Sequence, residues 1–199
     1  IKILIVMLET LKIIIPKFCY HDKLSTSGNC RMCLVEIKNV LNPVVSCCTI
    51  INNNMEVYTD TKLIRKSREN ILEFLLINHP LDCPICDQAG ECDLQDLTII
   101  YGSDTSKFRY EKKAILNKNV GPFIKTQMNR CIYCTRCVRY TNELNNTYIF
   151  NTIGRSGYSE IGNYYNNIDT ISSYVNGNVI DLCPVGALTA KPNTFRNRP

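Results

Sequence analysis

The sequence lacks an uninterrupted hydrophobic run long enough to cross a membrane. Its most apolar stretch, Ile1–Ile15, is broken by two lysines, a glutamate and a threonine, and it is shorter than the roughly 20 apolar residues that a membrane-spanning helix needs. No small-residue cleavage site follows it, and there is no Arg- and Ser-rich transit peptide. We therefore expect no direct membrane span and no visible targeting signal.

Runs of basic residues and nucleotide-binding motifs are also missing. The net charge of +5 comes from 23 basic and 18 acidic residues, which are scattered along the chain and form no patch of the kind that binds nucleic acid. The sequence contains no GxGxxG fingerprint and no Ser/His/Asp set. We therefore expect no nucleic-acid partner, no catalytic residues and no dinucleotide site.

Cysteine, in contrast, is abundant, with 12 in 199 residues. A disulfide framework is typical of small secreted domains, and nothing in this sequence indicates secretion. Many of the cysteines form CxxC pairs, and a disulfide across so short a loop restricts the unfolded chain very little. Two alternatives remain, zinc and iron–sulfur clusters, because both use closely spaced cysteines.

The first set of cysteines is Cys19, Cys30, Cys33 and one of the adjacent pair Cys47/Cys48. Residues 25–33 are rich in small side chains, which allow backbone amides to approach the sulfurs of a cluster. The set keeps the C-x2-C step of plant-type ferredoxins with a longer first gap. A zinc site has no need of such a long polar loop, so the spacing favours a [2Fe–2S] cluster over zinc.

The second set has only three cysteines, at positions 83, 86 and 92. His79 precedes them, at the end of an amphipathic helix expected over residues 61–78 and ended by Pro80. A set that lacks one ligand makes His79 a candidate for the fourth position, although an ordinary helix-end histidine is the alternative. His21 stands beside Cys19, whose set already has four thiols, so we expect a structural role for it.

The third set consists of Cys131, Cys134 and Cys137 with the distant Cys183, which is followed by proline. Bacterial ferredoxins use C-x2-C-x2-C-x3-C-P, but the position after the three-residue gap is Thr141 here. The remote Cys183 supplies the Cys-Pro end instead. Three cysteines within seven residues are typical of a [4Fe–4S] cluster and rare in zinc sites.

Short elements are expected between these sets. The residue pattern predicts strands over 34–37, 44–47 and 55–58, helices over 61–78 and 91–100, a helix starting near Val138, and irregular polar sequence over 151–178. The fold class is therefore α+β with small cores. Bound clusters are expected to contribute to folding, as structural metals do in small domains.

Five segments together resemble one known family, the large iron–sulfur subunit of respiratory complex I (NADH:ubiquinone oxidoreductase), in its N-terminal iron–sulfur half only. The resemblance extends through nearly the whole chain, and the segment 78–96 is the most specific. The segments are IPKFCYH (15–21), GNCRMCLVEI (28–37), NHPLDCPICDQAGECDLQD (78–96), RCIYCTRCVR (130–139) and IDLCPVGALT (180–189).

This resemblance implies three modules. Residues 1–78 would form a ferredoxin-like β-grasp module with its closing helix, 79–118 a module with one histidine and three cysteine ligands, and 119–199 a module with four cysteine ligands. The implied cofactors are one [2Fe–2S] and two [4Fe–4S] clusters. Their ligands would be Cys19, Cys30, Cys33 and Cys47; His79, Cys83, Cys86 and Cys92; and Cys131, Cys134, Cys137 and Cys183.

The choice of Cys47 over Cys48 depends on aligning residues 43–47 with the family, which puts the ligand directly after Ser46. If residues 43–48 form a strand, neighbouring side chains point to opposite faces, so only one of the two cysteines can face the cluster.

The resemblance also implies a function. The chain would be an electron-relay subunit of an oxidoreductase, passing electrons from the flavin- and NADH-binding subunit toward quinone and downstream iron–sulfur subunits. Its location would be the matrix side of the mitochondrial inner membrane, or the cytoplasmic face in a bacterium. The alternative is an electron-transfer subunit of an NAD-reducing hydrogenase or formate dehydrogenase, which shares this module order.

Two departures from the family pattern accompany the resemblance. The family continues into a large molybdopterin-oxidoreductase-like domain, which we expect here to be carried by a separate chain or lost. The family also begins with a β-hairpin before the position of Ile1. This chain is expected to start at the first helix, with the hairpin missing, diverged or contributed by another chain.

Overall fold

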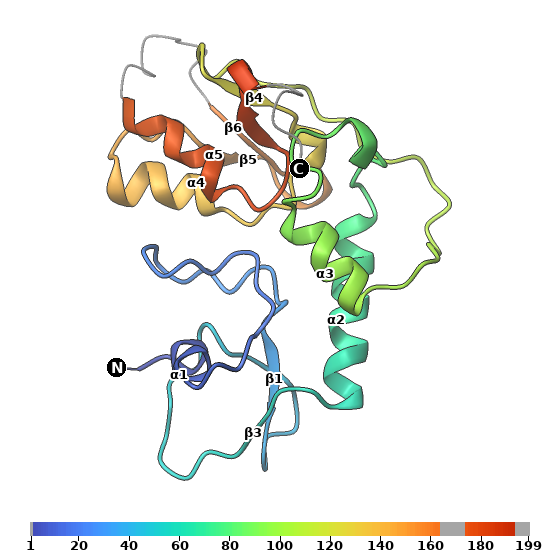
Figure 1. The fold of residues 1–199 in the computed structure, drawn as a ribbon, viewed down its shortest axis with the longest axis vertical. Helices are drawn as coiled ribbons and strands as arrows, with labels where there is room; N and C mark the ends of the chain where they lie inside the picture. The colour runs from blue at the N-terminus through green and yellow to red at the C-terminus, as the bar shows by residue number, and fades with distance from the viewer. Residues whose placement is uncertain (1, 164–173, 194–199) are drawn as a thin grey trace.

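The computed structural model describes residues 2–163 and 174–193. The N-terminal part, with α1, β1 and β3, lies at the bottom of Figure 1. Helices α2 and α3 lie side by side at the right, and the C-terminal part, with α4, α5 and the later strands, lies at the top. None of the helices in the described ranges has the length and apolar character required to cross a membrane.

The N-terminal part is a small antiparallel sheet covered by a helix. Strand β1 (Leu34–Ile37) lies between β2 (Val44–Val45) and β3 (Val57–Tyr58). In register, Leu34 faces Val45 and Ile37 faces Val57. Helix α1 (Leu4–Thr10) buries Leu4, Ile5 and Leu8 against this sheet. A helix at the start of the chain is what the family resemblance implied, and the strand expected over 44–47 is shorter because residues 46–48 turn away.

Helix α2 (Lys62–Leu76) is the helix predicted over residues 61–78. Thr61 caps it, since its side-chain oxygen accepts a hydrogen bond from the amide of Ile64 at 3.2 Å. The helix ends before His79 because a residue that precedes proline is disfavoured in helical conformation. Helix α3 (Asp93–Tyr101) packs against α2, and Leu72 and Leu94 meet in one buried cluster.

The C-terminal part contains two antiparallel strand pairs and short helices. Strand β4 (Ile124–Thr126) pairs with β7 (Leu188–Ala190), and β5 (Asn151–Ile153) pairs with β6 (Glu160–Gly162). Helix α4 (Arg136–Arg139) continues as a π-helical turn over Tyr140–Leu144, and α5 (Val179–Leu182) precedes Cys183. Within the described residues, the 3₁₀ turns are Cys83–Ile85, Met128–Arg130, Ser156–Tyr158, Tyr174–Asn178 and Lys191–Asn193.

The hairpin β5–β6 corrects the expectation of irregular structure over 151–178, of which residues 164–173 lie outside the described ranges. Each strand has only three residues, too few to produce a recognisable alternation. Gly154 starts the turn with φ of +78°, and a Cβ there would lie 2.5 Å from the carbonyl oxygen of Tyr158. Glycine is therefore required at this turn.

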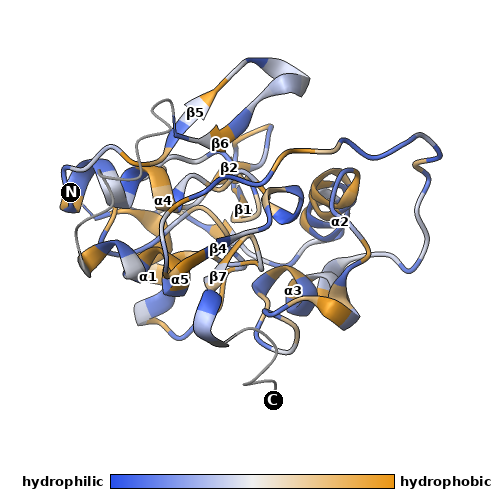
Figure 2. Cartoon of the chain, turned by 90° about the horizontal axis from the view of Figure 1, so that it is seen from above, coloured by the Kyte–Doolittle hydropathy of each residue, from blue (hydrophilic) through white to orange (hydrophobic). Residues whose placement is uncertain are grey.

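The largest shared feature is a buried core to which all three parts contribute. It contains Phe18 and Met32 from the first part, Leu72 and Leu94 from the α2–α3 pair, and Ile132 from the C-terminal part. The connector between α3 and β4 bulges away from the two helices (Figure 1) and is largely polar (Figure 2). The three cysteine sets therefore surround a common apolar centre.

Candidate iron–sulfur cluster sites

The structure brings together the four cysteines of the first set. Cys19, Cys30, Cys33 and Cys47 are all buried, with exposed fractions of 8% or less. The amide of Cys19 donates to the sulfur of Cys30 at 3.4 Å. The thiol of Cys47 contacts those of both Cys19 and Cys33. The long polar loop of residues 20–29 therefore brings together Cys19 and Cys30, the two cysteines that flank it.

Backbone amides surround these sulfurs, as the sequence predicted. The amide of Met32 hydrogen-bonds to Cys30, and that of Cys47 hydrogen-bonds to Cys33. Hydrogen bonds between the thiols lower the pKa of Cys19 and bring the pKa of Cys33 to about 6. The same contacts raise the pKa of Cys30 and Cys47. Amides and hydroxyls that stabilise thiolates suit a cluster with cysteine ligands.

Cys47 and Cys48 differ sharply in their surroundings. Strand β2 ends at Val45, so strand alternation does not separate them; the amide of Cys48 instead bonds to the carbonyl of Val45 in a turn. Cys47 is fully buried, whereas Cys48 is exposed, with the two sulfurs 3.6 Å apart. A Cβ on Gly28 would lie 2.7 Å from the Cys48 sulfur, so this glycine makes room for Cys48 and not for the four buried thiols. Burial and contacts therefore favour Cys47 as the ligand.

The second set lines a pocket of its own. Cys83 begins a 3₁₀ turn, Cys92 precedes α3, and His79 follows α2 with its amide bonded to the carbonyl of Leu76 at 3.2 Å. The pocket is lined by His79, Asp82, Cys83, Cys86, Ala89, Cys92, Gln95, Arg130 and Gly186. The three cysteines and the histidine that the sequence linked by position are therefore neighbours in space.

His79 has the character of a metal ligand. Burial, together with the charges of Arg130 and Lys112, lowers its pKa to about 4, so the imidazole is neutral at pH 7. Its Nδ1 atom is buried and has no hydrogen-bond partner among the described residues. A buried polar atom without a partner is costly, and ligation of iron by the imidazole would remove that cost or hold the ring in the required orientation.

Residues from the C-terminal part complete the second pocket. Arg130 donates through Nε and Nη2 to one carboxylate oxygen of Asp82, at 3.2 and 3.1 Å. Lys125 pairs with Asp87 at 2.6 Å. Gly186 lies so close that a Cβ there would be 2.3 Å from the Cys86 sulfur. Nothing in the sequence indicated these contacts, because Gly186, Arg130 and Lys125 are of residue types that occur in many structural roles.

The third set lies in the most apolar surroundings. Its four cysteines share a pocket with apolar residues from β6, from β7 and from the segments around Ile132 and Val185. The pocket is lined by Met128, Cys131, Ile132, Cys134, Thr135, Arg136, Cys137, Ile161, Cys183, Val185, Ala187 and Leu188. Burial raises the pKa of Cys131 and Cys134 to about 12. The amide of Tyr133, a residue in the left-handed region, points at the Cys131 sulfur at 3.4 Å.

Within the described ranges, no three or more His, Cys, Asp or Glu side chains converge on the position of a single metal ion. Cysteines of one cluster bind different iron atoms, so they need not converge on one point. The residues of the first set contact one another, and those of the second and third sets each line one pocket. These arrangements suit clusters better than single metal ions.

Two buried arginines connect the first and third sets, and the sequence did not predict their role. Arg139 donates to the carbonyl oxygens of Cys19, Ser25 and Cys134. Arg136 donates to the carbonyl of Tyr20 at 3.0 Å. Both side chains are less than 10% exposed. Each arginine stands two residues after a cysteine of the third set. This position alone indicates little, since an arginine beside a cysteine loop is usually a surface residue. The Nδ1 atom of His21 accepts a hydrogen bond from the amide of Lys23 within the loop.

Three family models match successive parts of the chain. Residues 2–62 match a 2Fe-2S iron–sulfur cluster binding domain, and residues 68–107 match the NADH-ubiquinone oxidoreductase-G iron–sulfur binding region. Residues 121–189 match the ferredoxin-like domain of NADH-quinone oxidoreductase subunit 3. One [2Fe–2S] region and [4Fe–4S] regions are therefore present in this chain, as the cofactor prediction stated.

Longer proteins with similar sequences are subunits of NADH-ubiquinone or NADH-quinone oxidoreductase. The chain is 55% identical to the NADH-ubiquinone oxidoreductase 75 kDa subunit of Reclinomonas americana over 92% of its length, which is 26% of that protein. It is 51% identical to the mitochondrial 78 kDa subunit of Candida albicans, over 96% of this chain and 26% of that protein. It is also 51% identical to an NADH-quinone oxidoreductase subunit of Rickettsia typhi, over 92% of this chain and 27% of that protein. The chain thus spans about a quarter of the length of these relatives.

A chain of a solved NAD+-reducing [NiFe]-hydrogenase has the same fold, with a TM-score of 0.88 over 98% of this chain and 83% of that chain, at 24% identity. That similarity concerns the fold alone. The sequence identities of about half, together with the three successive family matches, confirm the resemblance seen in the cysteine motifs. The chain therefore belongs to the family of the large iron–sulfur subunit of NADH-ubiquinone oxidoreductase and corresponds to its iron–sulfur-binding part.

Proposed function

We propose that this chain is the electron-relay part of the peripheral arm of NADH:ubiquinone oxidoreductase, which passes electrons from the flavin subunit toward quinone. One observation supports this proposal above the others: three separate ligand sets surround one apolar core, to which Cys19, Cys92 and Cys134 each contribute from a different set. When bound, iron–sulfur clusters supply one-electron redox chemistry. A shared, rigid core would hold three such centres at fixed separations.

The proposed ligands are four residues for each cluster. Cys19, Cys30, Cys33 and Cys47 would hold the [2Fe–2S] cluster. His79, Cys83, Cys86 and Cys92 would hold one [4Fe–4S] cluster, and Cys131, Cys134, Cys137 and Cys183 the other. The contacts and shared pockets described above support each set.

The surrounding residues would act on the clusters through burial, hydrogen bonds and charge. Amides of Cys19 and Met32 would stabilise negative charge on the Cys30 sulfur. The carbonyl-bound guanidinium groups of Arg136 and Arg139 would add positive charge between the first and third sets. Burial and hydrogen bonding to sulfur are levers by which a protein sets cluster potentials.

The organisation proposed for the chain follows from these sets. Residues 1–78 would form a β-grasp module, 79–118 the histidine-ligated module and 119–199 the all-cysteine module. The partners would be the flavin- and NADH-binding subunit, downstream iron–sulfur subunits and a domain or separate chain that corresponds to the rest of the relatives. The location would be the matrix side of the mitochondrial inner membrane, or the equivalent cytoplasmic face in bacteria.

The test is isolation of the native complex under anaerobic conditions, followed by identification of the chains that accompany this one. We expect flavin and membrane subunits of an NADH:quinone oxidoreductase and iron-dependent visible absorption. Beyond the iron of the other subunits, about ten iron atoms should belong to this chain, two plus four plus four. Isolation with hydrogenase or formate dehydrogenase subunits would favour the alternative function. A colourless, zinc-containing chain would contradict both.

A further inference from the structure

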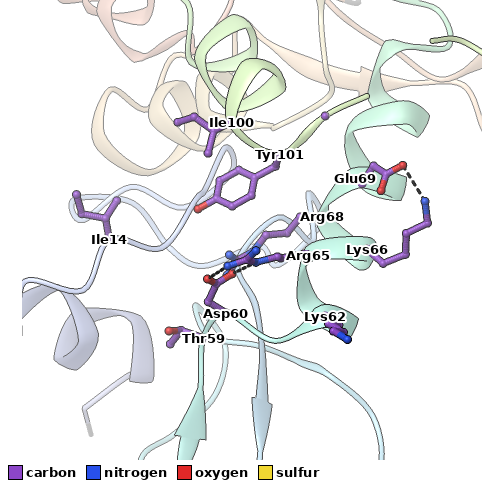
Figure 3. A pocket seen from close by; sticks show the side chains of 11 residues that line it. Ile14, Thr59, Asp60, Lys62, Arg65, Lys66, Arg68, Glu69, Ile100 and Tyr101 are labelled. Carbon is purple, nitrogen blue, oxygen red and sulfur yellow. Dashed lines mark hydrogen bonds and ion pairs between the residues drawn. The ribbon is translucent and has the colours of Figure 1, made fainter. Parts of the chain in front are cut away.

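A second kind of site lies away from all proposed cluster ligands. It is an open pocket between the first half of α2, the end of α3 and the segments around Ile14 and Thr59 (Figure 3). Its polar wall is made by four basic and two acidic side chains, which are Lys62, Arg65, Lys66, Arg68, Asp60 and Glu69. It is called the α2 pocket below.

Arg68 is the unusual residue of the α2 pocket. It is only 2% exposed, and in Figure 3 it reaches from α2 into the space between Tyr101 and Asp60. Its Nη2 donates to the carbonyl of Leu34 at 3.1 Å, and its guanidinium lies 5.1 Å from the centre of the Tyr101 ring. Its side chain also hydrogen-bonds to that of Tyr101, whereas its Nε is buried without a hydrogen-bond partner among the described residues. No ion pair joins it to a carboxylate within the described ranges.

The two acidic residues of the pocket are already engaged. Asp60 accepts hydrogen bonds from both Nε and Nη2 of Arg65, at 2.7 and 2.5 Å, and Glu69 pairs with Lys66 at 2.7 Å. Lys62 and Arg68 therefore remain as positive charges without a paired carboxylate in the described part of the chain. The amino end of α2 adds partial positive charge at the same place. A buried guanidinium with incomplete partners favours an anion.

Two exposed aliphatic side chains lie at the rim of the pocket. Ile14 and Ile100, which line the same pocket, are 89% and 66% exposed. In Figure 3, Ile14 lies on the side to which the Tyr101 hydroxyl points, and Ile100 lies above the Tyr101 ring. A free inorganic oxoanion would leave these aliphatic side chains in water. An acidic residue of a polypeptide with apolar neighbours would pair with the cations and cover the isoleucines at the same time.

We propose that the α2 pocket binds an acidic side chain of a partner polypeptide, flanked in that partner by aliphatic residues, with Arg68 and Lys62 as the cationic contacts. None of its lining residues is a proposed cluster ligand. The inference therefore does not rest on the proposed electron relay.

The test uses the cluster-loaded chain and a dye-labelled nonapeptide with Leu-Glu-Leu at its centre in a Gly/Ser background. A peptide with Gln in place of Glu is the matched probe, and fluorescence anisotropy measures binding. We expect the Glu peptide to bind at least about tenfold more tightly than the Gln peptide, because the contact is a charge-assisted hydrogen bond. We also expect Arg68→Gln and Lys62→Gln to weaken binding by about the same factor.

Arg109→Gln is the control, since it removes an equally positive but exposed residue outside the pocket. Lys62 is exposed, so Lys62→Gln keeps the test valid if Arg68→Gln fails to fold. Visible absorption of the clusters verifies that each variant is intact. Equal binding of both peptides, or no effect of Lys62→Gln, would overturn the proposal. Saturable binding of inorganic phosphate at the pocket without binding of the Glu peptide would replace it with a free-anion site.

Discussion

Arg139 donates a hydrogen bond to the carbonyl oxygen of Cys19, a residue 120 positions earlier in the chain. The same guanidinium donates to the carbonyl of Cys134 at 3.3 Å. One buried cation therefore joins a proposed ligand of the [2Fe–2S] cluster to a proposed ligand of the all-cysteine [4Fe–4S] cluster. Its removal should affect both.

For Arg139→Met, we expect a loss of roughly 3 kcal/mol in the free energy of unfolding, because the buried carbonyls of Cys19, Ser25 and Cys134 lose a charged donor. Thermal unfolding of the cluster-loaded chain measures this loss. The electron paramagnetic resonance (EPR) signals of both connected clusters should also change. Arg109→Met, at an exposed position, should leave stability and spectra as they are. An unaltered melting temperature in Arg139→Met would show that these hydrogen bonds from Arg139 do not stabilise the fold.

Gly186 belongs to the Cys-Pro-Val-Gly segment of the third set, yet its substitution should disturb the second cluster. A Cβ at this position would lie 2.3 Å from the sulfur of Cys86 and 3.2 Å from Cβ of Gln88. We expect Gly186→Ala to alter or abolish the EPR signal of the proposed histidine-ligated cluster, while the signal of the proposed Cys131–Cys183 cluster persists. The matched control is Gly157→Ala, whose added Cβ has no neighbour within 4 Å. Loss of the third cluster alone would contradict this interpretation.

Cys47 and Cys48 provide a direct comparison between neighbours. Cys47→Ala removes a buried thiol that contacts Cys19 and Cys33, so the [2Fe–2S] EPR signal should disappear. Cys48→Ala removes an exposed thiol, so the signal should remain with nearly unchanged stability. The two variants are each other's control. The opposite pattern would assign the ligand to Cys48.

For His79→Ala in the assembled complex, we expect one [4Fe–4S] signal to be lost or grossly altered. The physical reason is that a neutral, buried imidazole would complete the proposed set of three thiols. The [2Fe–2S] signal and that of the Cys131–Cys183 cluster should persist. Iron analysis and EPR measure the outcome, and His21→Ala, at the other histidine, is the control. An unchanged iron content with three intact signals would make His79 an ordinary helix-end residue.

The sequence allowed the locally encoded features to be predicted. Strand β1 lies at its expected residues, and α2 and α3 differ from expectation by two residues or fewer at each end. These elements have caps, apolar spacing or a following proline, all of which are local signals. The grouping of His79 with Cys83, Cys86 and Cys92 was also visible, because the four lie close together in the chain.

Features that depend on distant contacts could not be predicted. The pairing of β4 with β7 joins segments at Ile124 and Ala190, and each has only three residues. The roles of Arg130 and Arg139 depend on carbonyl and carboxylate groups that only the folded chain brings to them. The strand expected over 44–47 is longer than the observed β2, which contains only the two β-branched valines. The chain turns at Ser46, directly after them.

The completion of the second pocket by Arg130 and Gly186 has a consequence for biosynthesis. A ribosome makes His79 and its three cysteines well before it makes the glycine that closes over Cys86. Domains emerge from the ribosome in N- to C-terminal order, so this central ligand set would stay open to solvent until the segment around Gly186 has been synthesised. Cluster insertion there would then be a late event, although its ligands are encoded in the middle of the chain.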